Sequence, residues 1–289
     1  MRKRKAIFGY LFSLPWLIGF IILTAYPLVY SLYMSLHNIT IGATGIEAQF
    51  VGFNNFSYAF TLDLPFLSSL FETIRVVGLL TPLVLILSMV IGILLNKITR
   101  LKGVFRTLYF LPVVIVSGSL MSILDENGVF DVVNFESATI YRWLSGTALS
   151  GVLYITNFLI SQIFTVLWFS GVQILIYLSG MQKMNASVYE AAAIDGASSW
   201  QCFWKITLPA LKQFTIINVF YTITMLATFP TNSVIILIQE NMFGTAVNQG
   251  LGYSSALAWT YFILIILILV VFLFLVGLRL PRRKEGVRP

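Results

Sequence analysis

The sequence predicts an all-α integral membrane protein with six transmembrane helices and a cytoplasmic helix–Gly–helix loop. Of its 289 residues, 58% are hydrophobic and 10% are charged, and the mean hydropathy is +0.90. A soluble domain has roughly 45–50% apolar and about 25% charged residues. Six apolar stretches approach or exceed the roughly 20 residues that a helix needs to cross a bilayer. We expect one domain over residues 1–289, with spans at Ile7–Leu32, Thr73–Leu95, Val104–Leu124, Val152–Leu178, Phe214–Ile238 and Ala256–Leu278.

The distribution of lysine and arginine predicts how these spans are oriented. Basic residues gather before the first span, between the second and third, between the fourth and fifth, and after the sixth, whereas acidic residues collect in the alternate loops. Positive loops stay on the cytoplasmic side, so both termini are expected in the cytoplasm. The net charge of +7 is therefore a sign of topology, and nucleic acid is not an expected partner. The first span is too long for a cleaved signal peptide.

Several classes of function lack the residues that they need. One cysteine (Cys202) and one histidine (His37) cannot form a disulfide or a histidine cluster, so no metal site is expected. The span interiors hold almost none of the ionisable groups that proton- and ion-coupled transporters bury. The phosphate-binding pattern G-x-x-x-x-G-K-[ST] is missing as well. The chain is therefore expected to have no catalytic residues and no cofactor, and any ATP and Mg²⁺ would be bound by a separate ATPase.

The polar segment 182–212, between the fourth and fifth spans, predicts two short helices at the cytoplasmic face. Ser187 and Glu190 have the spacing of a capping box at the start of the first helix. The alanines that follow favour helix, and Gly196 is expected to end it in a left-handed conformation. Ordinary interfacial helices are the alternative interpretation, because aromatic residues favour the level of the lipid headgroups.

The second helix is predicted from another capping box, formed by Ser198 and Gln201. Its aromatic residues Trp200, Phe203 and Trp204 share one face, which we expect to anchor it on the membrane-spanning body. Pro209 suits the first turn of the fifth span.

The same segment resembles the EAA loop of permeases from binding-protein-dependent ABC importers. Its elements are Glu190-Ala191-Ala192, Asp195-Gly196-Ala197 and the I-x-L-P run Ile206–Pro209. Further stretches resemble the larger permease subunit of maltose-type sugar importers, so that the resemblance covers nearly the whole chain. These stretches are FVGFNNF (Phe50–Phe56), FRTLYFLP (Phe105–Pro112) and LGYSSALAW (Leu251–Trp259).

This resemblance implies a carbohydrate importer in the bacterial inner membrane. It implies a heterodimer with a second, distinct permease, two ATPase subunits and an external solute-binding protein. The first loop helix would dock on the ATPase through Glu190, Ala191, Ala192, Asp195 and Gly196. The spans before and after the loop would line the sugar path, with candidates at Trp168, Gln173, Tyr221, Thr222, Thr224, Met225, Phe229 and Asn232.

Two outward loops depart from the family pattern. Neither Asp125–Gly146 nor Leu237–Tyr253 carries the usual family run. Two alternatives therefore stay open: the same architecture importing another small polar solute such as glycerol phosphate, and an ATPase-independent channel or secondary transporter.

Overall fold

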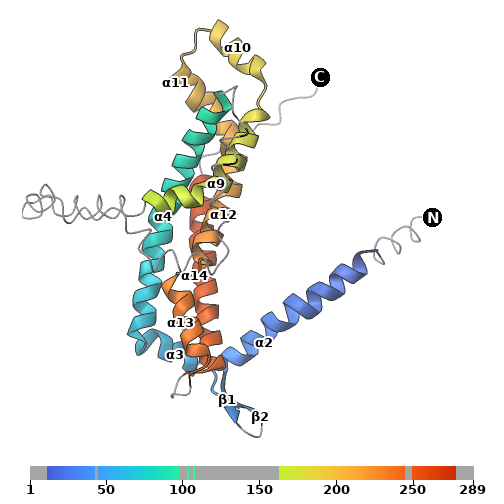
Figure 1. Ribbon diagram of the computed structural model, residues 1–289, viewed down its shortest axis with the longest axis vertical. Helices are drawn as coiled ribbons and strands as arrows, with labels where there is room; N and C mark the ends of the chain where they lie inside the picture. Colours follow the sequence, from blue (N-terminus) through green and yellow to red (C-terminus); the bar gives the residue numbers. More distant parts are fainter. Residues whose placement is uncertain are drawn as a thin grey trace, which may run out of the picture. The chain divides into compact units, whose positions relative to one another are not determined.

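The computed structural model describes residues 12–42, 45–97, 103, 107, 163–244 and 249–277 (Figure 1). The predicted third span (apart from Thr107), the first part of the predicted fourth span and the loop 125–146 lie outside these residues. The described elements are η1 (Ile21–Ala25), α2 (Tyr26–Ser35), β1 (His37–Gly42), β2 (Gly45–Phe50), α3 (Asn54–Thr61), α4 (Leu64–Lys97), α9 (Ile163–Gln182), α10 (Ala186–Ile194), α11 (Ser199–Cys202), η3 (Phe203–Thr207), α12 (Leu208–Ala227), α13 (Ser233–Met242) and α14 (Leu251–Gly277).

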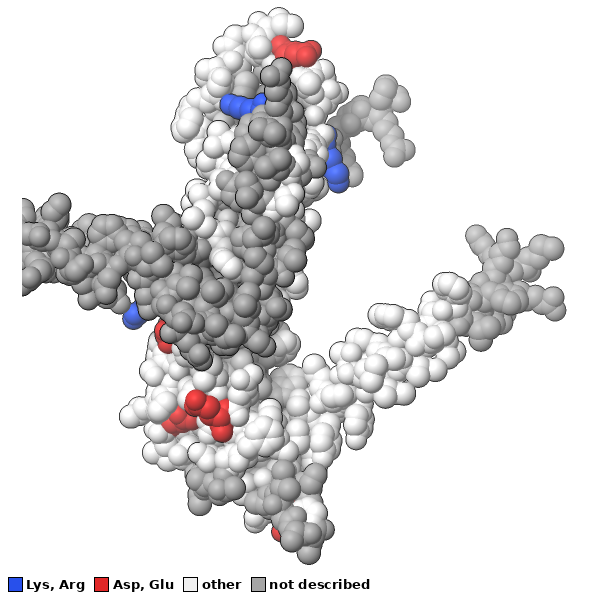
Figure 2. All heavy atoms as spheres, viewed as in Figure 1, with Lys and Arg blue, Asp and Glu red and all other residues white. Residues whose placement is uncertain are grey.

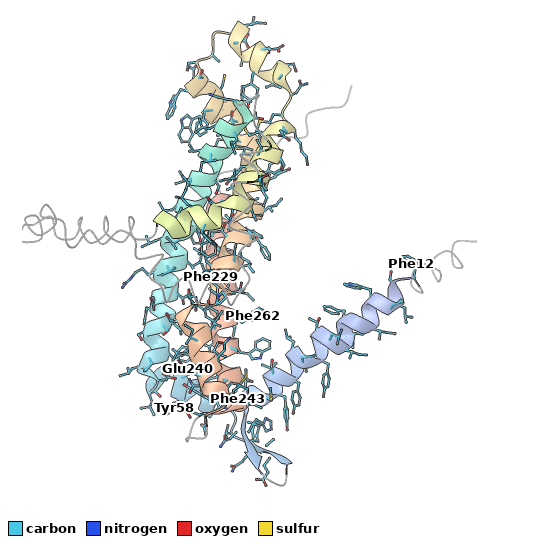
Figure 3. All side chains as sticks on the ribbon, viewed as in Figure 1. Phe12, Tyr58, Phe229, Glu240, Phe243 and Phe262 are labelled. Carbon is cyan, nitrogen blue, oxygen red and sulfur yellow. The ribbon has the colours of Figure 1, made fainter. Side chains whose placement is uncertain are left out.

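Within the described part of the chain, four helices are long and apolar enough to cross a membrane. They are Phe12–Ser35, Leu64–Lys97, Ser199–Ala227 and Leu251–Gly277, and the shorter apolar helices are Val166–Gln182 and Ser233–Met242. The side chains of Phe12–Ser35 project from the ribbon, and none of its most apolar window is buried in this chain (Figure 3). An apolar helix of that kind requires lipid or another protein around it.

Prolines shape three of these helices. Pro27 follows the π-helical turn η1 (Ile21–Ala25), and Pro209 follows the π-helical turn η3 (Phe203–Thr207). A proline donates no hydrogen bond and its ring crowds the carbonyl four residues earlier, so a widened turn lets each helix continue. Near Pro230 no helix continues: α12 ends at Ala227 and α13 begins at Ser233. The expected span Phe214–Ile238 is thus two helices, since proline also disfavours helix at the residue before it.

The chain divides into two compact units, which are described separately. The first holds residues 1–72 and 233–264. It contains an element that an all-α fold does not include, the antiparallel hairpin β1–β2, in which His37 pairs with Phe50 and Gly42 with Gly45. Ile39, Thr40 and Ile41 are β-branched residues that favour a strand, and this explains the departure from the prediction.

Buried polar contacts hold this first unit together. The Asn55 side chain donates to the carbonyl oxygens of Ser35 (2.9 Å), the last residue of α2, and of His37 (3.2 Å), the first residue of β1. Asn55 is the second asparagine of the FVGFNNF run, so the structure gives that residue a capping role. The Tyr253 hydroxyl donates to the Asp63 carboxylate at 2.5 Å, and a Cβ at Gly252 would overlap the carbonyl oxygen of His37.

The second unit holds residues 73–232 and 265–289. Its core lies among α4, α9 and α12, with the later part of α14 packed against it. Two glycines allow close approach of these helices: a Cβ at Gly92 would lie 3.1 Å from the Tyr177 Cβ, and one at Gly180 would lie 2.7 Å from Cδ2 of Phe214. At the end of α14 the Lys212 ammonium donates to the carbonyl oxygen of Gly277 (3.1 Å), which favours that helix terminus. The buried core residues are Val77, Leu80, Val84, Leu85, Val166, Phe169, Val219, Ile223 and Leu226.

Candidate functional site

The predicted first loop helix is present as α10, but its N-terminal cap differs from the prediction. The Asn185 side chain accepts a hydrogen bond from the Ser187 amide at 3.1 Å, so Asn185 is the N-cap and Ser187 lies inside the first turn. The expected Ser187–Glu190 capping box is therefore wrong. Asparagine and serine are about equally favoured N-caps, and the turn at Lys183 and Met184 places the earlier residue at the helix start.

α10 is ended as expected by Gly196, which follows the C-cap Asp195 and has φ +77°. The Gly196 amide donates to the Ala193 carbonyl (3.1 Å) and the Ala197 amide donates to the Ala192 carbonyl (2.9 Å). This pair of bonds is a Schellman motif, which glycine favours because it carries no Cβ. α10 is thus closed by specific hydrogen bonds at both ends.

The surface of α10 is open to solvent, and none of its residues is buried. Glu190 and Asp195 are exposed acids, Ala191 and Gly196 are exposed, and Ala192 is half-buried. Ile194, at the last turn, is 87% exposed. Figure 2 shows acidic atoms at the tip formed by α10, with basic atoms beside them. An exposed helix that carries four alanines and Glu190, and is followed by Asp195 and Gly196, is a surface that another protein can approach closely.

The second predicted capping box is confirmed. The Gln201 amide donates to the Ser198 hydroxyl (3.3 Å), and the Ser198 amide donates to the Gln201 side chain (2.8 Å). The helix that it opens does not end before the next span. α11, η3 and α12 run on as one helix from Ser199 to Ala227.

The aromatic residues of this helix contact one another. The ring centroids of Trp200 and Trp204 lie 5.5 Å apart, and those of Phe203 and Trp204 lie 5.2 Å apart. Trp200 is 69% exposed and Trp204 is 49% exposed. The exposure of Trp200 and Trp204 departs from the expected anchoring on the membrane-spanning body, whereas Phe203 is half-buried.

A polar bridge that the sequence did not indicate joins α10 to the long helix. The hydroxyl groups of Tyr189 and Thr207 lie 2.9 Å apart and share a hydrogen bond, and the Tyr189 hydroxyl also lies 3.1 Å from the sulfur of Met184. Tyr189 is half-buried and Thr207 is buried. The bridge fixes the first loop helix against η3.

A second candidate site is a buried polar cluster between α9 and α12. The Gln173 side-chain amide donates to the Thr222 hydroxyl at 2.9 Å, and the Asn218 side-chain amide donates to the Gln173 backbone carbonyl at 3.3 Å. All three side chains are 0% exposed. The side-chain oxygens of Gln173 and Asn218 have no hydrogen-bond partner among the described residues. An unsatisfied buried acceptor costs roughly 1–3 kcal/mol, so each of these two oxygens weakens the packing of α9 on α12 unless it finds a donor.

Of the predicted path residues, the structure brings Gln173 and Thr222 into direct contact. Phe229 packs edge-to-face on Phe169, with ring centroids 4.8 Å apart, and is labelled in Figure 3. Met225 also packs against the buried core. Thr224 is exposed, whereas Trp168, Tyr221 and Asn232 are half-buried.

Sequence reasoning missed Asn218, and with it the buried Ser88 and Ser170. The Ser88 hydroxyl donates to the Val84 carbonyl at 2.5 Å and lies 3.5 Å from the Ser170 carbonyl. One signal was available, because Asn218 precedes Thr222 by four residues and so shares its helix face. Within the described ranges, no group of three or more histidine, cysteine, aspartate or glutamate residues could hold a metal ion.

Comparisons with known proteins relate this arrangement to transport. No family model matches the chain. It is 31% identical over 216 residues to the multiple sugar-binding transport system permease protein MsmF of Streptococcus mutans, covering 73% of this chain and 72% of that protein. It is 27% identical over 291 residues to the arabinooligosaccharides transport system permease protein AraP of Bacillus subtilis, covering 93% and 88%.

A solved structure has the same fold. It is the bacterial alginate ABC transporter in complex with an alginate pentasaccharide-bound periplasmic protein. One of its chains superposes with a TM-score of 0.61 at 19% identity, covering 98% of each chain.

Proposed function

Because the chain belongs to the family of permease subunits of carbohydrate ABC importers, we propose that it forms one half of a sugar path across the bacterial inner membrane. A second, distinct permease would form the other half, and an external solute-binding protein would deliver the carbohydrate. Two ATPase subunits would bind ATP and Mg²⁺, and both termini would lie in the cytoplasm. The similarity to MsmF and AraP supports a mono- or oligosaccharide as cargo.

We propose that α10 is the element that receives the ATPase. The observation that supports this role is a short helix with no buried residue that is nevertheless held at both ends by specific caps. Such a helix is rigid before it meets a partner, so its binding does not carry the cost of ordering a loop. Glu190 and Asp195 would contribute charge, and Ala191, Ala192 and Gly196 would allow close approach.

We propose that the α9–α12 cluster belongs to the sugar path. Sugar hydroxyls are hydrogen-bond donors and acceptors, and they could satisfy the oxygens of Gln173 and Asn218 that have no partner among the described residues. Thr222 would exchange its bond with Gln173 for one to the substrate. Phe229, Met225 and Trp168 would supply apolar and aromatic surface nearby, with Tyr221, Thr224 and Asn232 at the margin. The described members of the cluster include no cation, which disfavours glycerol phosphate as the cargo.

Charge reversal tests the ATPase contact directly. The importer would be assembled with its second permease, ATPases and binding protein in vesicles, and sugar uptake and sugar-stimulated ATP hydrolysis would be measured. We expect Glu190→Lys and Asp195→Lys each to lower both rates more than tenfold. A tenfold weaker ATPase contact corresponds to only about 1.4 kcal/mol, and two like charges facing each other across an interface cost more than that.

The matched control is Glu240→Lys, which reverses an exposed acid on α13 and should leave both rates within twofold. Undiminished coupling in both loop variants would remove α10 from the ATPase interface. Uptake by the chain without any ATPase would instead favour the channel or secondary-transporter alternative.

A further inference from the structure

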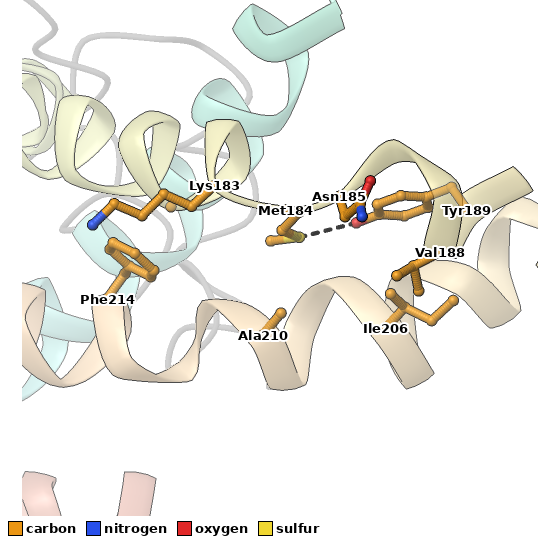
Figure 4. A pocket seen from close by; sticks show the side chains of 9 residues that line it. Lys183, Met184, Asn185, Val188, Tyr189, Ile206, Ala210 and Phe214 are labelled. Carbon is orange, nitrogen blue, oxygen red and sulfur yellow. Dashed lines mark hydrogen bonds between the residues drawn. The ribbon is translucent and has the colours of Figure 1, made fainter.

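A cavity of about 320 Å³ lies between α10 and the long helix that follows it (Figure 4). Its walls come from Gly180 and Lys183 at the end of α9, Val188 and Tyr189 on α10, and Ile206 and Phe214 on the long helix. The volume falls at the lower end of the roughly 300–1,000 Å³ that small-molecule sites occupy. The polar bridge between Tyr189 and Thr207 keeps α10 in position beside the cavity.

The cavity has the chemistry of an amphiphile site. Most of its lining is apolar, and Lys183 is the one charged side chain among the residues that line it. The Lys183 ammonium lies 5.7 Å from the centroid of the Phe214 ring, a cation–π distance that holds the charge beside the apolar wall. In Figure 4 the Lys183 and Phe214 side chains lie next to each other on one side of the cavity.

The cavity also lies beside one apolar helix and at the end of another. Ile206, Ala210 and Phe214 belong to the candidate span Ser199–Ala227, whereas Lys183 directly follows the apolar helix Val166–Gln182. A ligand lying along this wall would have its apolar part beside the span and its polar end beside the lysine. Basic pockets between membrane helices bind the headgroups of anionic lipids in this way.

We propose that this cavity binds an anionic phospholipid, with part of one acyl chain against Val188, Ala210 and Phe214 and the phosphate at Lys183. The bound chain would touch both α10 and α12, so it would support the loop helix from the side opposite its exposed surface. The proposal rests on the proposed function only in placing this surface at the cytoplasmic leaflet.

Photolabelling tests the site in the assembled importer. The complex would be reconstituted in vesicles of phosphatidylcholine that contain a trace of phosphatidylglycerol with a photoreactive group in its acyl chain. We expect the label on the peptide that carries Val188 or on the one that carries Phe214. Lys183→Gln should lower labelling about fivefold, the factor that one cation contributes near an anionic surface. Ala210→Phe should lower it at least as much by filling the cavity.

Two matched variants control for general effects on the membrane surface. Lys205→Gln removes an exposed lysine, and Gln213→Phe adds a ring to an exposed position on the same helix, and neither residue lines the cavity. Both should label like the wild type. Equal labelling of Lys183→Gln and Lys205→Gln would overturn the anionic-lipid site. Labelling by photoreactive phosphatidylcholine to the same extent as by photoreactive phosphatidylglycerol would also overturn it. A label found only on an ATPase subunit would show that the ATPase covers the cavity. Sugar uptake by the same vesicles reports on the proposed function independently of the label.

Discussion

The Gln173–Thr222 hydrogen bond offers the sharpest test of the packing between α9 and α12. Its atoms lie 2.9 Å apart and both side chains are fully buried. Thr222→Val keeps the shape but leaves the Gln173 amide without its acceptor, and a stranded buried donor costs roughly 1–3 kcal/mol in a soluble protein. Hydrogen bonds between membrane helices average about 0.6 kcal/mol with a maximum near 1.7, because the unfolded chain also finds partners.

A double-mutant cycle isolates the pair. We expect the variant with both Gln173→Met and Thr222→Val to be about 1 kcal/mol more stable than the sum of the two single changes predicts, since it strands neither partner. The free energy of unfolding would be measured by tryptophan fluorescence in mixed detergent micelles. The six tryptophans of the chain provide the signal.

A second cycle on the same two helices is the control. Thr215 bonds to the Tyr177 hydroxyl (3.2 Å) and to the Leu211 carbonyl (3.2 Å). The effects of Gln173→Met and Thr215→Val on the free energy of unfolding should therefore be additive within about 0.5 kcal/mol. If the changes in the free energy of unfolding caused by Gln173→Met and Thr222→Val are also additive, the two side chains do not share a hydrogen bond. The packing of α9 on α12 then differs from that described.

Two further predictions compare two positions that hold the same residue type. Gly180→Ala should lower the free energy of unfolding by about 1–3 kcal/mol because its Cβ would lie 2.7 Å from the Phe214 ring, whereas Gly78→Ala has open space and should be neutral or stabilising; thermal unfolding of both would show it. Asn55→Ala should lower the free energy of unfolding by about 1–3 kcal/mol in the same assay, since it strands the carbonyls of Ser35 and His37. Asn54→Ala, at an exposed position, should change it little, and equal unfolding midpoints for the two variants would refute the capping role.

The parts of the loop that could be predicted from the sequence are those set by local chemistry. Gly196 ends α10 and Ser198 caps α11 because one residue type satisfies each backbone requirement far better than its neighbours do. The start of α10 could not be decided in this way, because Asn185 and Ser187 are both good caps. The hairpin β1–β2 was missed although Ile39, Thr40 and Ile41 favour a strand, since a loop between two spans needs no regular structure.

The parts that the sequence could not provide depend on which helices pack together. Nothing local distinguishes Asn218 from a solvent-facing asparagine until α12 lies against α9 and its amide reaches the Gln173 carbonyl. The end of α12 is an intermediate case. The sequence stays apolar from Phe214 to Ile238, yet the backbone near Pro230 is not helical. The proline therefore predicts the end of the helix better than the length of the apolar run does.

One helix carries both candidate sites of the second unit, and this bears on how they would communicate. The Tyr189–Thr207 bridge fixes α10 to η3, and from Thr207 the helix continues without a break to Thr222, about 20 Å along its axis. A rigid helix moved at one end moves at the other, whereas a jointed one absorbs the motion. The π-helical turn η3 ends at Thr207 and does not lie between Thr207 and Thr222, so it does not interrupt this path. A displacement of α10 would therefore shift Thr222 against Gln173, which is the bond that the proposed substrate exchange has to open.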